Sequence, residues 1–219
     1  MKIPRARSAF TLIELLVVIF VLAILAAILL PATTSHCGPR STLVICINNL
    51  RQVNLSFTMY ANDNGGNYPM GVSVKDGGTR DFIYTTHIFP HYEKLAKYKY
   101  IPGQQYLICP ADKTRKAATN SEAFTDLNIS YFLNADCSST NNPLKSFLAG
   151  DRNLMKNGHP VFPGTLIITT NVNLTWSQEI HQNGGSLAFA DGHVEFCKSD
   201  NFNSIIQRQP LATNRIVIP

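Results

Sequence analysis

The chain has 219 residues, of which 45% are hydrophobic; 19 are Lys or Arg and 14 are Asp or Glu, a net charge of +5. Three of the basic residues, Lys2, Arg5 and Arg7, stand in the first nine positions, which leaves 16 basic residues against 14 acidic ones in the remainder. That near-neutral remainder contains no dense Lys/Arg run, which speaks against a nucleic-acid-binding protein. It is long enough for one folded domain with a substantial core.

Residues 10–30 form an apolar segment that reads FTLIELLVVIFVLAILAAILL and contains one charged residue, Glu14. About 20 helical residues at ~1.5 Å each are enough to cross a ~30 Å hydrocarbon core. The basic leader in front of the segment predicts that the N-terminus stays in the cytoplasm. The sequence therefore predicts a single membrane-spanning helix, in which a carboxylate is costly and indicates function.

The order of basic leader, small residue and F-T-L-I-E-L-L resembles the N-terminal signature of prepilins, the family of type IV pilins and type II secretion pseudopilins. The resemblance implies that a prepilin peptidase cuts between Ala9 and Phe10 and that the new amino group of Phe10 is methylated. The family usually has Gly before the cut, where this chain has the similarly small Ala9. During assembly Glu14 would neutralise the amino group of a neighbouring subunit, since opposite charges attract strongly where water is scarce.

Two other interpretations of the N-terminus are an ordinary secretory signal peptide and a membrane anchor that is not processed. A signal peptide has an apolar core of about 7–15 residues and a later A-x-A-like cleavage site. The segment over residues 10–30 is longer than that and carries Glu14. The prepilin interpretation divides the chain into a leader at 1–9 and a transmembrane and assembly helix at 10–30.

The helix is expected to continue as an amphipathic segment over residues 31–62, with a break near 38–39. Apolar residues recur there at steps of three and four from Leu43 to Tyr60, which is typical of one buried helix face. Residues 62–67 read NDNGGN, which predicts the end of the helix and a loop. The spacing of the Asp and Asn residues matches no EF-hand loop, which argues against a calcium site.

Residues 63–219 are expected to form an extracytoplasmic globular domain of short strands and loops. Strands are predicted at 105–109, 129–133, 146–149, 165–170, 186–190 and 193–197, and a short helix at 92–100. The predicted fold class is α+β and pilin-like: a long N-terminal helix, half membrane-spanning and half amphipathic, packs on a C-terminal antiparallel β-sheet with long loops.

Asp191-Gly192 lies between two alternating apolar runs and predicts a hairpin with a two-residue type I′ turn, in which Phe189 faces Val194. His181 stands ten residues earlier, which gives an H-x9-DG pattern in the segment 181–197. This pattern resembles the C-terminal region of a subgroup of prepilin-like proteins. Further stretches resemble the same subgroup: residues 46–52, 59–64, 109–112, 130–131 and 149–152. Because these stretches are spread along the sequence, the resemblance extends over most of the chain.

His181, Asp191 and His193 could ligate zinc together if the segment around His181 folds over the turn. The alternative is a structural role. In that case His181 forms a hydrogen bond near the turn, Asp191 is present because it tolerates a left-handed backbone conformation, and His193 is exposed. We expect the structural role, and therefore predict no metal and no cofactor.

Five cysteines occur without any C-x-x-C pair, which disfavours a zinc knuckle. Disulfides persist outside the cytoplasm, and we favour a bridge between Cys46, on the predicted helix stripe, and Cys109, just before Pro110. The odd number leaves at least one free thiol.

The sequence contains no nucleophile elbow, phosphate loop or metalloprotease helix, so we expect no enzyme. The resemblance implies a structural subunit that resides in the inner membrane with its C-terminal domain outside the cytoplasm. Prepilin peptidase and other pilin-like subunits would be its partners, and a type IV pilus or type II secretion pseudopilus its assembly. The alternative is a membrane-anchored extracytoplasmic binding or adhesion module that uses a prepilin-type N-terminus.

Overall fold

The structure, a computed structural model, describes residues 11–29, 39–120, 123–141 and 143–219. The chain divides into two compact units, Met1–Gly38 and Pro39–Pro219. Helix α1 (Leu12–Leu29) belongs to the first unit, and helix α2 (Pro39–Asp63) opens the second. Since residues 30–38 lie outside the described ranges, the predicted single long helix is not confirmed.

The second unit mixes helices and short strands. Its other helices are α3 (Phe89–Lys97) and α4 (Ser199–Gln207), with 3-10 turns η2 (Pro69–Gly71), η3 (Arg80–Phe82), η4 (Gln104–Leu107) and η5 (Asp126–Asn128). Its strands are β1 (Tyr131–Asn134), β2 (Phe147–Asp151), β3 (Leu154–Lys156), β4 (His159–Pro160), β5 (Gly164–Thr169), β6 (Leu174–Trp176), β7 (Gly184–Phe189), β8 (Val194–Lys198) and β9 (Thr213–Ile218).

Six of these strands form one antiparallel sheet in the order β5-β9-β1-β2-β7-β8. The last strand, β9, pairs between β5 and β1, so that the C-terminal segment lies one strand in from the β5 edge of the sheet. Strands β4, β3 and β6 form a second, three-stranded sheet. The α+β architecture with a helix packed on an antiparallel sheet is as predicted from the sequence.

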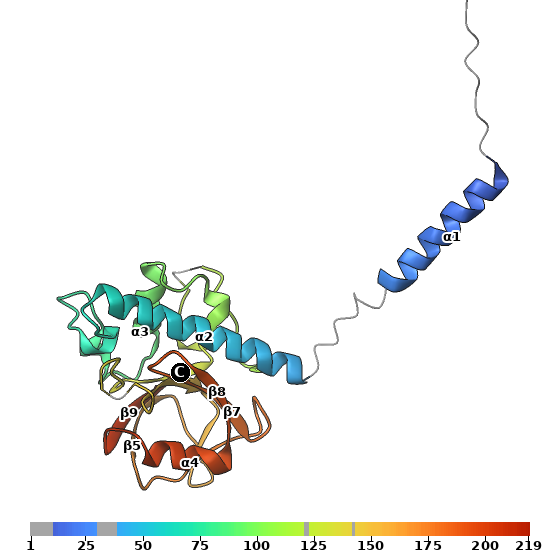
Figure 1. Cartoon of the computed structure of the whole chain (residues 1–219). Helices are drawn as coiled ribbons and strands as arrows, with labels where there is room; N and C mark the ends of the chain where they lie inside the picture. The colour runs from blue at the N-terminus through green and yellow to red at the C-terminus, as the bar shows by residue number, and fades with distance from the viewer. Residues whose placement is uncertain (1–10, 30–38, 121–122, 142) are drawn as a thin grey trace, which may run out of the picture. The chain divides into compact units, whose positions relative to one another are not determined.

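Both faces of the six-stranded sheet are covered. In β1, Tyr131 and Leu133 point into the core shared with α2, whereas Phe132 points into the core shared with Trp176 and Phe202. This alternation follows from the two-residue period of a strand, and burial on both sides explains why the strands are apolar nearly throughout. Helix α2 lies on one side of strands β7 and β8, and α4 on the other (Figure 1).

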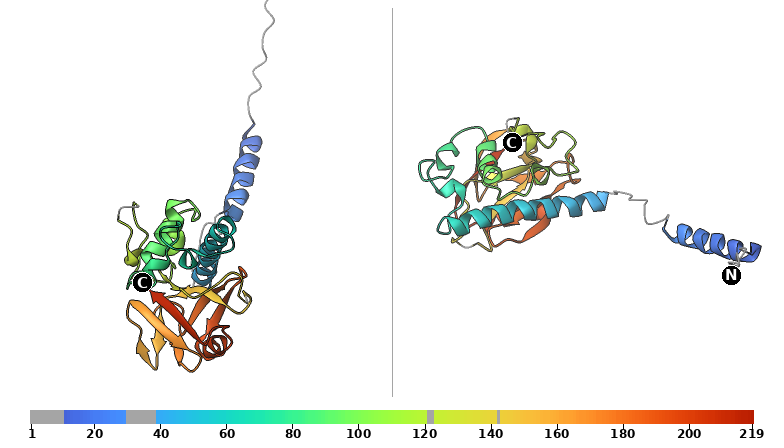
Figure 2. Two further views of the ribbon diagram at one scale, coloured as in Figure 1. Left: turned by 90° about the vertical axis from the view of Figure 1, so that its left-hand side faces the viewer. Right: turned by 90° about the horizontal axis from the view of Figure 1, so that it is seen from above.

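Helix α2 is the longest element of the second unit and supports its larger core. Leu50, Val53 and Phe57 are fully buried on one stripe, while Leu55 on the opposite side is 51% exposed. Phe57 makes edge-to-face contacts with two tyrosine rings, at centroid distances of 6.0 and 5.8 Å. The helix runs along the globular part in the right-hand view of Figure 2, and its stripe matches the predicted spacing.

Helix α1 (Leu12–Leu29) lies within the predicted membrane-spanning segment at 10–30. The two end residues of that segment, Phe10 and Leu30, lie outside the described residues. Within the described ranges, no helix combines the length and apolar character needed to cross a membrane. The membrane span therefore stays a prediction.

The hairpin of β7 and β8 is present, but its turn differs from the predicted type I′ turn. The register pairs Ala188 with Val194 and Leu187 with Glu195, one residue away from the predicted pairing. The N–H of Gly192 donates to the carbonyl of Phe189 at 3.0 Å, and positive φ occurs at Gly192 (+99°) but not at Asp191. A three-residue connection with one left-handed residue replaces the two-residue turn.

This shift places Ala188 and Val194 in the core under α2, and Leu187 and Phe189 in the opposite core. The prediction that Phe189 faces Val194 was therefore wrong. The physical reason is that both faces of β7 are buried, so the apolar pattern did not favour one register over its neighbour.

Replacing Gly192 with valine should lower the free energy of unfolding by about 1–3 kcal/mol, the cost of holding a β-branched residue at positive φ. A Cβ at this position would meet no atom within 4 Å, so backbone strain alone sets the cost. Denaturant unfolding followed by the fluorescence of the single Trp176 measures it. Gly192→Asn is the matched control, because Asn tolerates positive φ better, and equal losses in both variants would contradict this explanation.

Candidate functional site

Thr11 and Glu14 form the first turn of α1. The Glu14 carboxylate accepts hydrogen bonds from the backbone N–H and the hydroxyl of Thr11, both at 2.9 Å. The N–H of Glu14 in turn lies 3.4 Å from Thr11 Oγ1. This capping box satisfies N–H groups that a helix start leaves unpaired. The predicted cleavage and methylation residues, Ala9 and Phe10, lie outside the described residues.

The side chains of α1 are apolar on all sides of the helix. Exposed fractions reach 81% at Leu12 and 63% at Phe20, and large apolar residues stay exposed as far as Leu25. A contiguous apolar surface of this kind marks a site of contact with lipid or with other proteins.

Four side chains from separate elements meet at one point of the second unit. Cys46 comes from α2, Cys109 follows η4, Asp151 ends β2 and His181 precedes β7. Cys46 Sγ lies 3.3 Å from Asp151 Oδ1, and Cys109 Sγ lies 3.3 Å from His181 Nε2. His181 Nε2 lies 3.6 Å from Asp151 Oδ2, and all four ligand atoms lie within 4.8 Å of one another. We call this group the dithiol cluster.

Burial and mutual contact shift the pKa values of the dithiol cluster. Burial raises the pKa of the Cys46 thiol well above its usual range and also raises the pKa of Asp151. Contact with the Cys46 thiol, together with the hydrogen bond to His181, lowers the pKa of Cys109 to about 7. Burial alone would lower the pKa of His181, but the hydrogen bond with Cys109 and the charge of Asp151 raise it. Cys109 is thus the more acidic of the two thiols.

An ion-pair network holds the chain around the dithiol cluster in place. Arg152 donates to both carboxylate oxygens of Asp112, at 2.7 and 3.0 Å, and to Glu179 Oε1 at 2.6 Å. The Asp112 side chain is fully buried. Because Arg152 follows Asp151 and Asp112 follows Cys109 by three residues, this network keeps the cluster's thiol and carboxylate segments together.

The two cysteines predicted to form a disulfide, Cys46 and Cys109, are neighbours in the dithiol cluster. Both are buried, and the structure describes both thiols as free. Cys137 and Cys197 are buried and free as well. The disulfide between Cys46 and Cys109 therefore stays a prediction.

The zinc grouping of His181 with Asp191 and His193, the alternative to the expected structural role, is not formed. His193 Nδ1 contacts Asp191 Oδ1 at 2.5 Å and its ring stacks on Phe189, at the turn of the hairpin. His181 instead contacts Cys109 and Asp151. Among the described residues, the dithiol cluster is the one group of three or more His, Cys, Asp or Glu side chains whose possible metal-ligand atoms lie close together. Strand β7 (Gly184–Phe189) lies between His181 and the turn, so that His181 and Asp191 lie beyond opposite ends of this strand.

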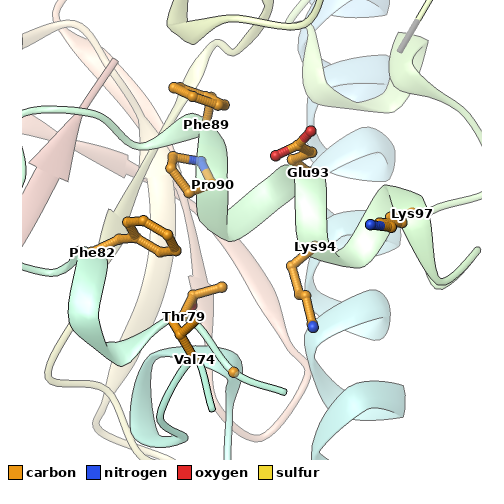
Figure 3. A pocket seen from close by; sticks show the side chains of 9 residues that line it. Val74, Thr79, Phe82, Phe89, Pro90, Glu93, Lys94 and Lys97 are labelled. Atoms are coloured by element: carbon orange, nitrogen blue, oxygen red, sulfur yellow. The ribbon is translucent and has the colours of Figure 1, made fainter. Parts of the chain in front are cut away.

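Two cavities of similar size lie on different parts of the second unit. One, of about 330 Å³, adjoins α3; Figure 3 shows apolar Phe82 and Pro90 on one side and the charged side chains of α3 on the other. None of its lining residues is a Cys or a His. The other cavity has about 360 Å³ and is lined by residues that include Leu43 of α2, His181 and Phe196. It leads from the surface to the imidazole of the dithiol cluster.

Residues 4–30 match a family model described as a prokaryotic N-terminal methylation motif. The chain carries a prepilin-type N-terminal signature. No curated protein and no solved structure matches the chain. The matched residues comprise most of the basic leader and the apolar segment.

Sequence reasoning missed the role of Asp151 in the dithiol cluster and the partners of His181. Asp151 was noticed only as part of the stretch 149–152, and Cys46 and Asp151 are 105 residues apart. The signal that could have found it is a buried strand that ends in a carboxylate, since such a group needs a compensating partner.

Proposed function

We propose that this chain is a pilin-like structural subunit that is cut between Ala9 and Phe10 by a prepilin peptidase, methylated at Phe10, and polymerised through residues 10–30. The observation that carries the proposal is the match of residues 4–30 to the N-terminal methylation motif. The assembly is a type IV pilus or a type II secretion pseudopilus, and the partners are other pilin-like subunits.

The charge pattern supports this proposal. The basic leader keeps the N-terminus in the cytoplasm, the apolar segment anchors the precursor in the inner membrane, and the second unit lies outside the cytoplasm. Cutting before Phe10 creates a positive amino group in apolar surroundings, where an unpaired charge is expensive. Glu14 of a neighbouring subunit supplies the matching negative charge.

The capping box of α1 fits the same role. In a single chain, Thr11 holds the Glu14 carboxylate at the start of the helix. A carboxylate oriented there by its own chain is available to a second donor, because each oxygen accepts more than one hydrogen bond. The apolar surface of α1 supplies the remaining contact with lipid before assembly and with other helices after it.

Filament isolation tests the proposal. The full chain is expressed in a bacterium that has a prepilin peptidase and a pilus or type II secretion assembly system, and surface filaments are sheared off. We expect processed protein in the sheared fraction, detected with an antibody against the second unit. Processed protein that stays entirely in the membrane fraction would contradict polymerisation and favour an anchored module.

A further inference from the structure

Beyond assembly, we propose that Cys46, Cys109, Asp151 and His181 bind one Zn²⁺ ion as a structural site that fastens α2 to the sheet. The side chains converge from four separate elements of the second unit. Two thiols, one imidazole and one carboxylate are ligand types that zinc accepts in a tetrahedral site. Calcium and magnesium are disfavoured, because they prefer a shell of oxygen ligands.

The distances fit this geometry. Zn–S bonds of ~2.3 Å and Zn–N or Zn–O bonds of ~2.0–2.2 Å place the ligand atoms of a tetrahedron roughly 3.3–3.8 Å apart. The dithiol cluster shows 3.3 Å from Cys46 Sγ to Asp151 Oδ1, 3.3 Å from Cys109 Sγ to His181 Nε2, and 3.6 Å from His181 Nε2 to Asp151 Oδ2. Three of the six ligand pairs thus stand at separations that a bound zinc ion requires, and all the ligand atoms lie within 4.8 Å of one another.

The surroundings hold the ligands in this arrangement. The backbone N–H of Ser186 donates to Asp151 Oδ2 at 2.6 Å, and the hydroxyl of Tyr131 lies 3.5 Å from Cys46 Sγ. The ring of His181 packs edge-on against Phe196. Supporting contacts of this kind orient metal ligands and raise metal affinity.

Charge and access also favour a cation here. The Asp151 side chain is fully buried, and buried carboxylates are stable when they are paired or bound to a metal. The 360 Å³ cavity reaches His181 from the surface between α2 and β8, which provides a route for the ion.

The alternative to zinc binding by the two sulfur atoms is a disulfide bond between Cys46 and Cys109. An S–S bond of ~2.0 Å consumes both thiolates, so that disulfide and zinc exclude each other. The structure has both thiols free, and the disulfide would use only two of the four side chains that converge here.

Metal analysis of the full-length protein tests the proposal. The chain is purified in detergent under reducing, anaerobic conditions without chelator, and its metal content is measured by inductively coupled plasma mass spectrometry. We expect about one zinc ion per chain, as in a single closed site. Replacement of zinc by Co²⁺ should give the visible absorption of a tetrahedral site and a thiolate-to-cobalt charge-transfer band. Zinc should also raise the melting temperature of the metal-free protein, because an ion that binds the folded state stabilises it.

Two pairs of variants make the test specific. Cys109→Ser and His181→Gln should lose the bound zinc and the zinc-dependent rise in melting temperature. Cys197→Ser and His193→Gln are matched controls outside the dithiol cluster and should keep both. If the cluster variants do not fold, the metal content and cobalt spectrum of the unaltered protein decide the matter.

Several results would overturn the site. These are a reduced, unaltered protein that binds no zinc, binding of copper(I) but not zinc, a cobalt spectrum without a thiolate band, or zinc binding that His193→Gln removes and His181→Gln does not. A linked peptide containing Cys46 and Cys109 in a non-reducing digest of the mature protein would establish the disulfide instead. None of these results bears on filament assembly, which is tested separately.

Discussion

Replacing Glu14 with glutamine should leave the protein in the membrane and remove most of it from filaments. Breaking a buried ion pair by removing one partner costs about 3–5 kcal/mol, and each ~1.4 kcal/mol is a factor of ten in an association constant. We therefore expect at least a roughly tenfold loss of subunit from the sheared filament fraction. Quantitative immunoblotting of the sheared and membrane fractions measures it.

Glutamine is chosen because it separates the two roles of Glu14. The side chain caps α1 through Thr11, and Gln serves in a capping box as well as Glu does. Glu14→Gln thus removes the charge and keeps the cap. The matched variant is Thr11→Val, which removes the hydroxyl of the cap and keeps the charge.

The pair of variants decides which role matters. If Glu14 neutralises a neighbour's amino group, Glu14→Gln should lose filaments and Thr11→Val should lose few. Equal loss in both variants would assign the effect to the helix cap. Normal filament yield from Glu14→Gln would remove the assembly role altogether.

Replacing Phe57 with alanine should lower the free energy of unfolding of the second unit by about 3–5 kcal/mol. The ring is fully buried on α2. It contacts Tyr68 and Tyr92 edge-to-face, and such aromatic pairs add to the loss of apolar burial. Denaturant titration followed by Trp176 fluorescence measures the effect.

Leu55→Ala is the matched control for Phe57→Ala. Leu55 stands on the same helix and is 51% exposed, so its truncation should cost less than about 0.5 kcal/mol. A small loss for Phe57→Ala, or a loss for Leu55→Ala of similar size, would contradict the packing of α2 described above.

Elements with a local pattern were predictable from the sequence. The stripe of apolar residues on α2 repeats at the helical period, and strands β2, β5 and β7 lie where short apolar runs predicted them. Helical periodicity marks the buried face of α2, and short continuous apolar runs mark strands such as β2 and β7 that are buried on both faces.

Other elements depend on partners far away in the chain. Residues 105–109 were predicted as a strand, but η4 occupies 104–107, because that run finds no strand beside it to complete a ladder. Strand β9 was not predicted, although it pairs with both β5 and β1. The six residues of β9 show little alternation of apolar and polar side chains. Only pairing with the neighbouring strands makes this segment a strand.

The N-terminal signature and the dithiol cluster differ in the same way, since one is local in the sequence and the other depends on distant segments. The N-terminal signature is contiguous, so that the leader, Phe10 and Glu14 could be read directly from the sequence. The dithiol cluster draws on four separate elements: Cys46 and Cys109 were paired as a predicted disulfide, but Asp151 and His181 were not placed with them. The zinc alternative grouped His181 with Asp191 and His193, because a sequence pattern shows spacing along the chain and not proximity in space.

Mass spectrometry of the N-terminal peptide decides whether this chain is a processed prepilin. The protein is purified from a host with an active prepilin peptidase and, in parallel, from one in which the peptidase is deleted. With the peptidase we expect a mature chain that begins at Phe10 with an N-methylated amino group, and without it a chain that keeps residues 1–9. A mature chain that begins elsewhere, or an uncut leader in the bulk of the protein from the active host, would contradict the claim.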